Sequence, residues 1–168
     1  MPGSPLTDSP FAVLTAVVAP AVLTNASSVL CLGTGNRLAR VVDRTRVITS
    51  EISSLEPASE DYRFRIRQLE LLDVRAHLLY RALRILYASL GAFAASALVS
   101  VIGSALAFYQ QHLGFQVAAV IGFASGVYAV GGLVFGCMLM VRETRVALQN
   151  IAEEAEYGRT HWKSINPK

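Results

Sequence analysis

Three long stretches of this sequence contain no charged side chain. They cover residues 11–35, 85–109 and 115–141, and none holds an aspartate, glutamate, lysine, arginine or histidine. Charged residues make up only 16% of the chain, against about 25% in a typical soluble domain. Each stretch exceeds the ~20 apolar residues that cross a hydrocarbon core about 30 Å thick. The absence of charge therefore argues against a soluble fold and predicts three transmembrane helices.

Basic residues are absent from the start of the chain. Residues 1–10 hold a single charge, Asp8, whereas a signal peptide begins with a positive segment. The residues before Cys31 are Ser28-Val29-Leu30, so Leu30 stands where a lipoprotein has a small residue just before its cysteine. We therefore expect residues 11–35 to be a mature helix, preceded by a flexible extracytoplasmic lead over residues 1–10.

Lysine and arginine are also missing from the short segment 110–114. All 15 lie within residues 37–84 or 142–168. Basic loops remain on the cytoplasmic side of a membrane, so the pattern predicts an N-terminus outside and a C-terminus inside. Topology accounts for the net charge of +3, and we expect no nucleic-acid partner.

Residues typical of catalytic and metal sites are scarce. The chain has two cysteines and three histidines, without metal-ligand spacing. The glycines near residue 33 lack the lysine of a phosphate-binding loop. No acidic residue falls within a predicted span, which disfavours a proton-relay transporter. The sequence therefore predicts no enzyme, no catalytic residue, no metal and no cofactor.

The charged segments between the spans have helical patterns. Residues 36–84 read as a cytoplasmic helical hairpin with a turn at residues 57–59, and residues 110–114 as an outer turn. Residues 142–168 read as a third cytoplasmic helix, to about Tyr157, followed by a polar tail. The predicted fold is an all-α membrane protein with three spans extended into cytoplasmic helices.

A heptad pattern of alternating steps of four and three runs from residue 20 to residue 55. Its members within the first span are small and mostly polar: Pro20, Thr24, Ser27, Cys31 and Thr34. Its cytoplasmic members are mostly apolar: Leu38, Val41, Thr45, Ile48, Ile52 and Leu55. Such a register is typical of coiled-coil packing. We interpret it as an oligomer seam, although a similar register from Leu69 to Phe93 could pack against it within the hairpin.

Polar side chains cluster after Pro20 in the first span. A proline within a helix frees a backbone carbonyl and kinks the axis. Hydroxyls and an amide one turn later can line a wet cavity, or they can hydrogen-bond between packed helices. The residues concerned are Thr24, Asn25, Ser27 and Ser28. Both interpretations stay open, and the first makes these residues pore-facing.

Small residues repeat every four positions in the other two spans. Ser96, Ser100 and Ser104 do so in the second, and Gly122-x-x-x-Gly126 in the third. This spacing lets helix backbones approach closely, so it predicts tight helix contacts and no chemistry.

Arginines cluster where the spans meet the cytoplasm. They can extend to anionic lipid headgroups, or form a site for an anionic ligand. Those assigned to headgroups are Arg37, Arg40, Arg44, Arg84 and Arg142.

Two segments resemble a family of small bacterial membrane proteins that is known only as a domain of unknown function. They are the run from Pro20 to Leu23 and the pattern Asn36-Arg37-x-x-Arg40-x-x-Asp43-Arg44-x-Arg46. The resemblance implies a multi-pass protein of the bacterial inner membrane with the same three-span layout. It implies no activity, substrate or site residue.

Two functional hypotheses follow from these patterns. In the first, the chain forms a homo-oligomer whose first span surrounds an axis and conducts monovalent or divalent ions, since three spans are too few to enclose a conduit alone. In the second, it is a non-catalytic scaffold or accessory subunit that binds a partner protein or anionic lipid. The hydroxyl-bearing face of the first span distinguishes the two.

Overall fold

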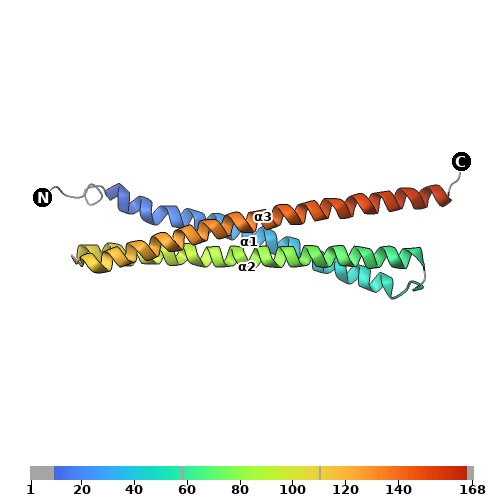
Figure 1. Ribbon diagram of the computed structural model, residues 1–168, viewed down its shortest axis with the longest axis horizontal. Helices are drawn as coiled ribbons and strands as arrows, with labels where there is room; N and C mark the ends of the chain where they lie inside the picture. Colours follow the sequence, from blue (N-terminus) through green and yellow to red (C-terminus); the bar gives the residue numbers. More distant parts are fainter. Residues whose placement is uncertain (1–9, 58, 110, 166–168) are drawn as a thin grey trace. The chain divides into compact units, whose positions relative to one another are not determined.

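The computed structural model describes residues 10–57, 59–109 and 111–165, and this part of the chain forms three α-helices and no strand (Figure 1). Helix α1 is Pro10–Ile52, α2 is Glu60–Phe108 and α3 is His112–Ile165. The all-α prediction is confirmed for these residues. The expected lead, residues 1–10, lies outside the described residues except for Pro10, which begins α1.

Helix α1 is unbroken from the predicted first span into the charged segment that follows it. It continues through Pro20 and through Gly33 and Gly35. It ends at Ile52, four residues before the end expected from sequence. There the hydroxyls of Ser53 and Ser54 donate to backbone carbonyls three residues earlier, at 2.7 Å. Such local bonds compete with helix continuation, which explains the early end.

Helix α2 begins where a capping residue stands. The hydroxyl of Ser59 accepts a hydrogen bond from the backbone N–H of Tyr62 at 3.1 Å, as an N-cap does. Glu60 and Asp61 then place negative charge in the first turn, where it complements the helix dipole. These residues fix the start of α2 close to the predicted turn at residues 57–59.

Helix α3 is longer at both ends than the sequence suggested. It begins at His112, inside the expected outer turn of residues 110–114, and continues past Gly158 to Ile165. Near its C-terminal end, the Tyr157 ring stacks on Phe64 of α2, and its hydroxyl donates to Asp61 Oδ1 at 2.6 Å. Contacts of this kind outweigh the ~1 kcal/mol that one glycine costs a helix.

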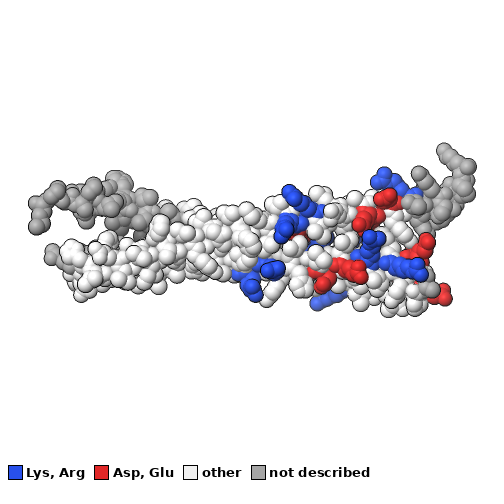
Figure 2. Space-filling model, viewed as in Figure 1, with Lys and Arg blue, Asp and Glu red and all other residues white. Residues whose placement is uncertain are grey.

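The chain divides into two compact units. We call Leu83–Gly136, together with α1 up to Gly33, the apolar unit, and Thr34–Ala82, together with the chain from Cys137 onward, the charged unit. The apolar unit contains one residue with a formal charge, Arg84. Figure 2 shows the charged side chains gathered over the charged unit.

Small residues let α2 and α3 approach closely within the apolar unit. Ser96 donates to the carbonyl of Gly122 at 3.0 Å, and Ser125 donates to that of Ala92 at 2.9 Å. A β-carbon added at Gly126 would lie 3.7 Å from the Ser96 hydroxyl. The glycine and serine repeats thus meet inside one chain.

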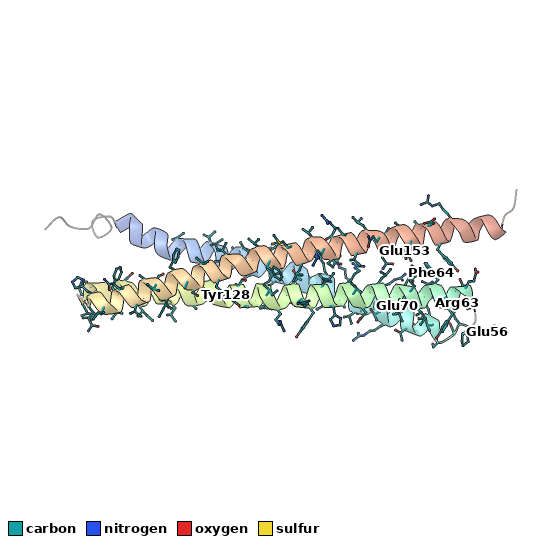
Figure 3. All side chains as sticks on the ribbon, in the orientation of Figure 1. Glu56, Arg63, Phe64, Glu70, Tyr128 and Glu153 are labelled. Carbon is teal, nitrogen blue, oxygen red and sulfur yellow. The ribbon has the colours of Figure 1, made fainter. Side chains whose placement is uncertain are left out.

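The outer surface of the apolar unit is rich in large apolar side chains. Phe108, Leu113, Val120 and Phe123 are all exposed, as is the aromatic ring of Tyr128, labelled in Figure 3. Among the residues whose side chains are described, two stretches are long and apolar enough to cross a membrane: Glu60–Leu106 and His112–Arg159. Most side chains in the first half of the predicted first span, including that of Pro20, are not among those described.

The core of the charged unit lies between α1 and α2. Val41 and Ile48 of α1 are buried in one cluster with Leu72 and Leu79 of α2. Partly buried apolar residues complete this cluster: Leu38, Ile52, Leu69 and Ala76. The heptad register therefore identifies the buried face of α1 in this unit.

Candidate functional site

The most unusual group in the charged unit is the carboxylate of Glu143 on α3. Its side chain is only 2% exposed. A buried carboxylate is tolerated in a protein only when it is paired or hydrogen-bonded. Its partners therefore define a specific arrangement of the surrounding helices.

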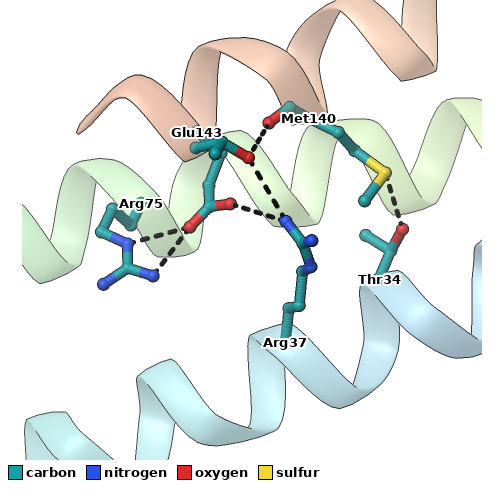
Figure 4. A network of polar contacts seen from close by, with 6 residues as sticks. Thr34, Arg37, Arg75, Met140 and Glu143 are labelled. Carbon is teal, nitrogen blue, oxygen red and sulfur yellow. Dashed lines mark hydrogen bonds and ion pairs between the residues drawn. The ribbon is translucent and has the colours of Figure 1, made fainter. Parts of the chain in front are cut away.

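Two arginines from two other helices pair with Glu143 (Figure 4). The Nε and Nη2 atoms of Arg75, on α2, both lie 2.9 Å from Oε1 of the glutamate. The Nη1 atom of Arg37, on α1, lies 3.5 Å from Oε2, and 3.3 Å from the hydroxyl of Thr144. Both carboxylate oxygens thus have a cationic partner, and the cluster links all three helices.

A second contact joins α1 to α3 beside this cluster. The buried hydroxyl of Thr34 lies 3.1 Å from the sulfur of Met140. The Arg37 side chain is 49% exposed and that of Arg75 is 22% exposed, so the surplus positive charge faces outward. This arrangement can hold helices together and attract an anion. The described residues contain no group of three potential metal ligands.

Glu143 could not be predicted from the sequence as part of a site. Its partners lie 68 and 106 residues away along the chain, so no local spacing reveals the cluster. The available signal was composition, because Glu143 is the first acidic residue after the third apolar stretch and stands between Arg142 and Arg145.

The polar residues predicted in the first span divide between two sides of α1. Ser27 is fully buried, Thr24 is partly buried, and Asn25 and Ser28 are exposed. Ser28 donates to the carbonyl of Thr24 at 2.9 Å, so its hydroxyl is satisfied within the helix. The four residues therefore do not share one face.

We expect Ser27→Ala to leave stability unchanged or to raise it slightly. The Ser27 hydroxyl oxygen is buried and has no hydrogen-bond partner among the described residues. Removing an unsatisfied polar group removes its desolvation cost, which is about 1–3 kcal/mol for such groups. Thermal unfolding of the detergent-solubilised chain measures this. A melting temperature well below that of the unaltered chain would mean that the hydroxyl has a partner in the native state.

The residues assigned to the oligomer seam are occupied within one chain. Val41 and Ile48 are buried against α2, Leu38 and Ile52 pack beside them, and Thr45 donates to the carbonyl of Val41 at 2.9 Å. Leu55 is half-buried beyond the end of α1. An assembly of several copies would therefore need a different surface of α1.

The arginines assigned to lipid headgroups fall into two groups. Arg37 pairs with Glu143, and Arg44 pairs with Glu154 at 3.2 Å. Arg40, Arg84 and Arg142 are exposed, and none has a carboxylate partner among the described residues. Arg81 and Arg145 are likewise exposed and have no carboxylate partner among the described residues.

A cavity of about 440 Å³ lies in the charged unit where α1 ends and α2 begins. The stacked rings of Phe64 and Tyr157 contribute to its lining, and Figure 3 labels Phe64. The hydrogen bond to Asp61 raises the pKa of Tyr157. Arg65 in the same lining pairs with Glu51 at 3.2 Å. Its polar groups therefore largely satisfy one another.

Comparison with known proteins identified one family model. The model described as "Protein of unknown function (DUF2721)" matches residues 17–153. Neither the curated proteins nor the solved structures gave a match.

Proposed function

The chain belongs to the DUF2721 family of proteins of unknown function, and we propose that it is a non-catalytic scaffold or accessory subunit that binds anionic lipid. In this proposal all three apolar stretches cross the bacterial inner membrane. The N-terminus lies outside, and the charged unit lies in the cytoplasm.

The surface of the apolar unit supports a membrane location. Its exposed side chains include phenylalanine, leucine and valine on both α2 and α3. So many exposed large apolar side chains are unusual on a soluble monomer, whose contiguous apolar patches are small. Within lipid this apolar surface does not need to be buried by other protein. The backbone N–H and C=O groups of the helices are hydrogen-bonded within each helix, as a membrane span requires.

The distribution of arginine partners carries the lipid proposal. Four arginines of the charged unit are exposed, lack a carboxylate partner among the described residues, and stand within nine residues of the apolar unit. We call them the boundary arginines: Arg40, Arg81, Arg142 and Arg145. At ~1.5 Å per residue, none is more than about 14 Å of helix from that unit.

Several arginines farther along the helices have internal carboxylate partners instead, whereas Arg63 and Arg159 have none among the described residues. Arg44, Arg65 and Arg67 each pair with a glutamate, at 3.2, 3.2 and 3.8 Å. A phosphate headgroup would provide the missing anion for the boundary arginines at the level where the inner leaflet is expected. Arg84, three residues beyond Arg81 on α2, offers the same chemistry.

We expect replacement of all four boundary arginines by glutamine to weaken binding of phosphatidylglycerol at least tenfold. Each cation near an anionic leaflet contributes about 1 kcal/mol. The measurement is the rise in melting temperature as phosphatidylglycerol is added to the detergent-solubilised chain. The matched control replaces Arg44, Arg46, Arg65 and Arg67, which removes the same charge. Equal losses in both variants would contradict a specific lipid contact.

A homo-oligomeric conduit with α1 around an axis is the second candidate. Asn25 favours it, because its amide is on the exposed side of α1. Ser27 is buried within the chain. The side of α1 that carries Asn25 would therefore have to line the conduit. Ion flux into liposomes, above the leak of empty vesicles, would support this candidate over the scaffold.

A further inference from the structure

One side of α1 in the apolar unit has no partner among the described residues. Its members follow a heptad pattern on the side opposite the buried Ser27 and Cys31. Three of them, Val22, Val29 and Leu32, are 61%, 65% and 67% exposed. We call this set the outer α1 face: Val18, Val22, Asn25, Val29 and Leu32.

Asn25 is the polar group at the centre of the outer α1 face. It is exposed and makes no side-chain hydrogen bond to the described residues. It lies near the middle of the predicted span of residues 11–35, whereas the other carboxamide in a predicted span, Gln116, is at a span end. Within hydrocarbon an unpaired carboxamide costs several kcal/mol. Asn25 therefore needs a partner from outside the chain.

A glycine beside this face leaves room for a close neighbour. A β-carbon added at Gly122, Gly126 or Gly132 would meet a neighbouring side chain, so those glycines serve packing inside the chain. A β-carbon at Gly33 would meet nothing within 4 Å, as is also true at Gly35, Gly91 and Gly131. Gly33 therefore serves no packing contact within the described part of the chain, and it would let a second helix approach this side of α1.

We infer that a second copy of this chain packs on the outer α1 face. This inference rests on the membrane location proposed above. Two copies inserted with the same orientation bring their α1 helices together in parallel, so Asn25 of one meets Asn25 of the other at the same depth. A carboxamide both donates and accepts, and the two side chains can therefore satisfy each other.

Several features favour a second copy over an unrelated helix. The pairing is self-complementary, as the interface of a two-fold dimer must be. A single asparagine among valines and leucine at heptad spacing is a known determinant of register and oligomeric state. The predicted seam farther along α1 is already occupied inside the chain, so it does not compete for the second copy.

Self-association can be measured in liposomes by energy transfer between labelled full-length chains as the protein-to-lipid ratio varies. We expect Asn25→Val to weaken association about tenfold, the ratio that corresponds to about 1.4 kcal/mol. Ala119→Val, an exposed change on α3 of the same unit, is the control and should leave association unchanged. Circular dichroism verifies the helix content of both variants.

Disulfide trapping locates the contact. In a chain with Cys31→Ala and Cys137→Ala, we expect Asn25→Cys to form a covalent dimer on oxidation and Ala119→Cys to remain monomeric. If the unaltered chain stays monomeric in liposomes at all ratios, or if Asn25→Val associates normally, the inference is wrong while the lipid proposal stands. A chain that does not insert into liposomes, as measured by flotation after carbonate washing, would overturn both.

Discussion

Replacing Arg75 by methionine is expected to lower the free energy of unfolding by about 3 kcal/mol. The change leaves the carboxylate of Glu143, 2% exposed, with Arg37 at 3.5 Å as its remaining cation. Breaking a buried pair by removing one partner typically costs about 3–5 kcal/mol, because an uncompensated charge stays buried. The half-exposed Arg37 offsets part of this, which favours the lower value. Unfolding in mixed micelles, followed by circular dichroism, measures the loss.

Two further variants distinguish a buried charge from a simple loss of packing. The double variant Arg75→Met, Glu143→Met should recover most of the lost stability, since an apolar pair often replaces a buried ion pair at little cost. Arg67→Met is the control, because Arg67 and Glu153 pair at 3.8 Å with side chains that are 72% and 46% exposed. Exposed pairs contribute about 0–1 kcal/mol. A double variant less stable than Arg75→Met alone would contradict this account.

The register of α1 could be read from the sequence, but its partner could not. The heptad from Ser27 to Ile52 coincides with the side of α1 that is buried or partly buried, because side chains at this spacing share one side of any helix. Periodicity does not distinguish a helix of the same chain from one of another copy. The buried cluster of Val41 and Ile48 with Leu72 and Leu79 comes from the same chain.

The candidate site was less predictable than the fold. Glu143 meets its two arginines only because three helices come together, and each pair spans at least 68 residues. The arginines form a recognisable group in the sequence, but the sequence does not separate Arg37, which pairs with Glu143, from Arg40, which has no carboxylate partner among the described residues. They are three positions apart on one helix, and only the packing of α3 distinguishes them.

Gly132→Val is expected to lower the melting temperature of the detergent-solubilised chain by about 5–10 °C. A β-carbon at Gly132 would overlap the hydroxyl of Ser89, and it would also lie 3.7 Å from Ile85. Ser89 is fully buried and donates to the carbonyl of Ile85 at 3.0 Å, so it has little room to move. Overpacking typically costs about 1–3 kcal/mol, and each kcal/mol corresponds to about 2–4 °C at this chain length.

The neighbouring glycine is a matched control for this steric argument. A β-carbon at Gly131 would meet nothing within 4 Å, so Gly131→Val should leave the melting temperature nearly unchanged although the helix propensity changes equally. A second substitution tests whether Ser89 is the residue that a side chain at position 132 would overlap. Gly132→Ala should be destabilising alone and largely restored by Ser89→Ala, because the two β-carbons would then lie at the ordinary distance of 3.6 Å. If Gly131→Val and Gly132→Val are equally destabilising, close packing of α2 on α3 at this level is not what requires Gly132.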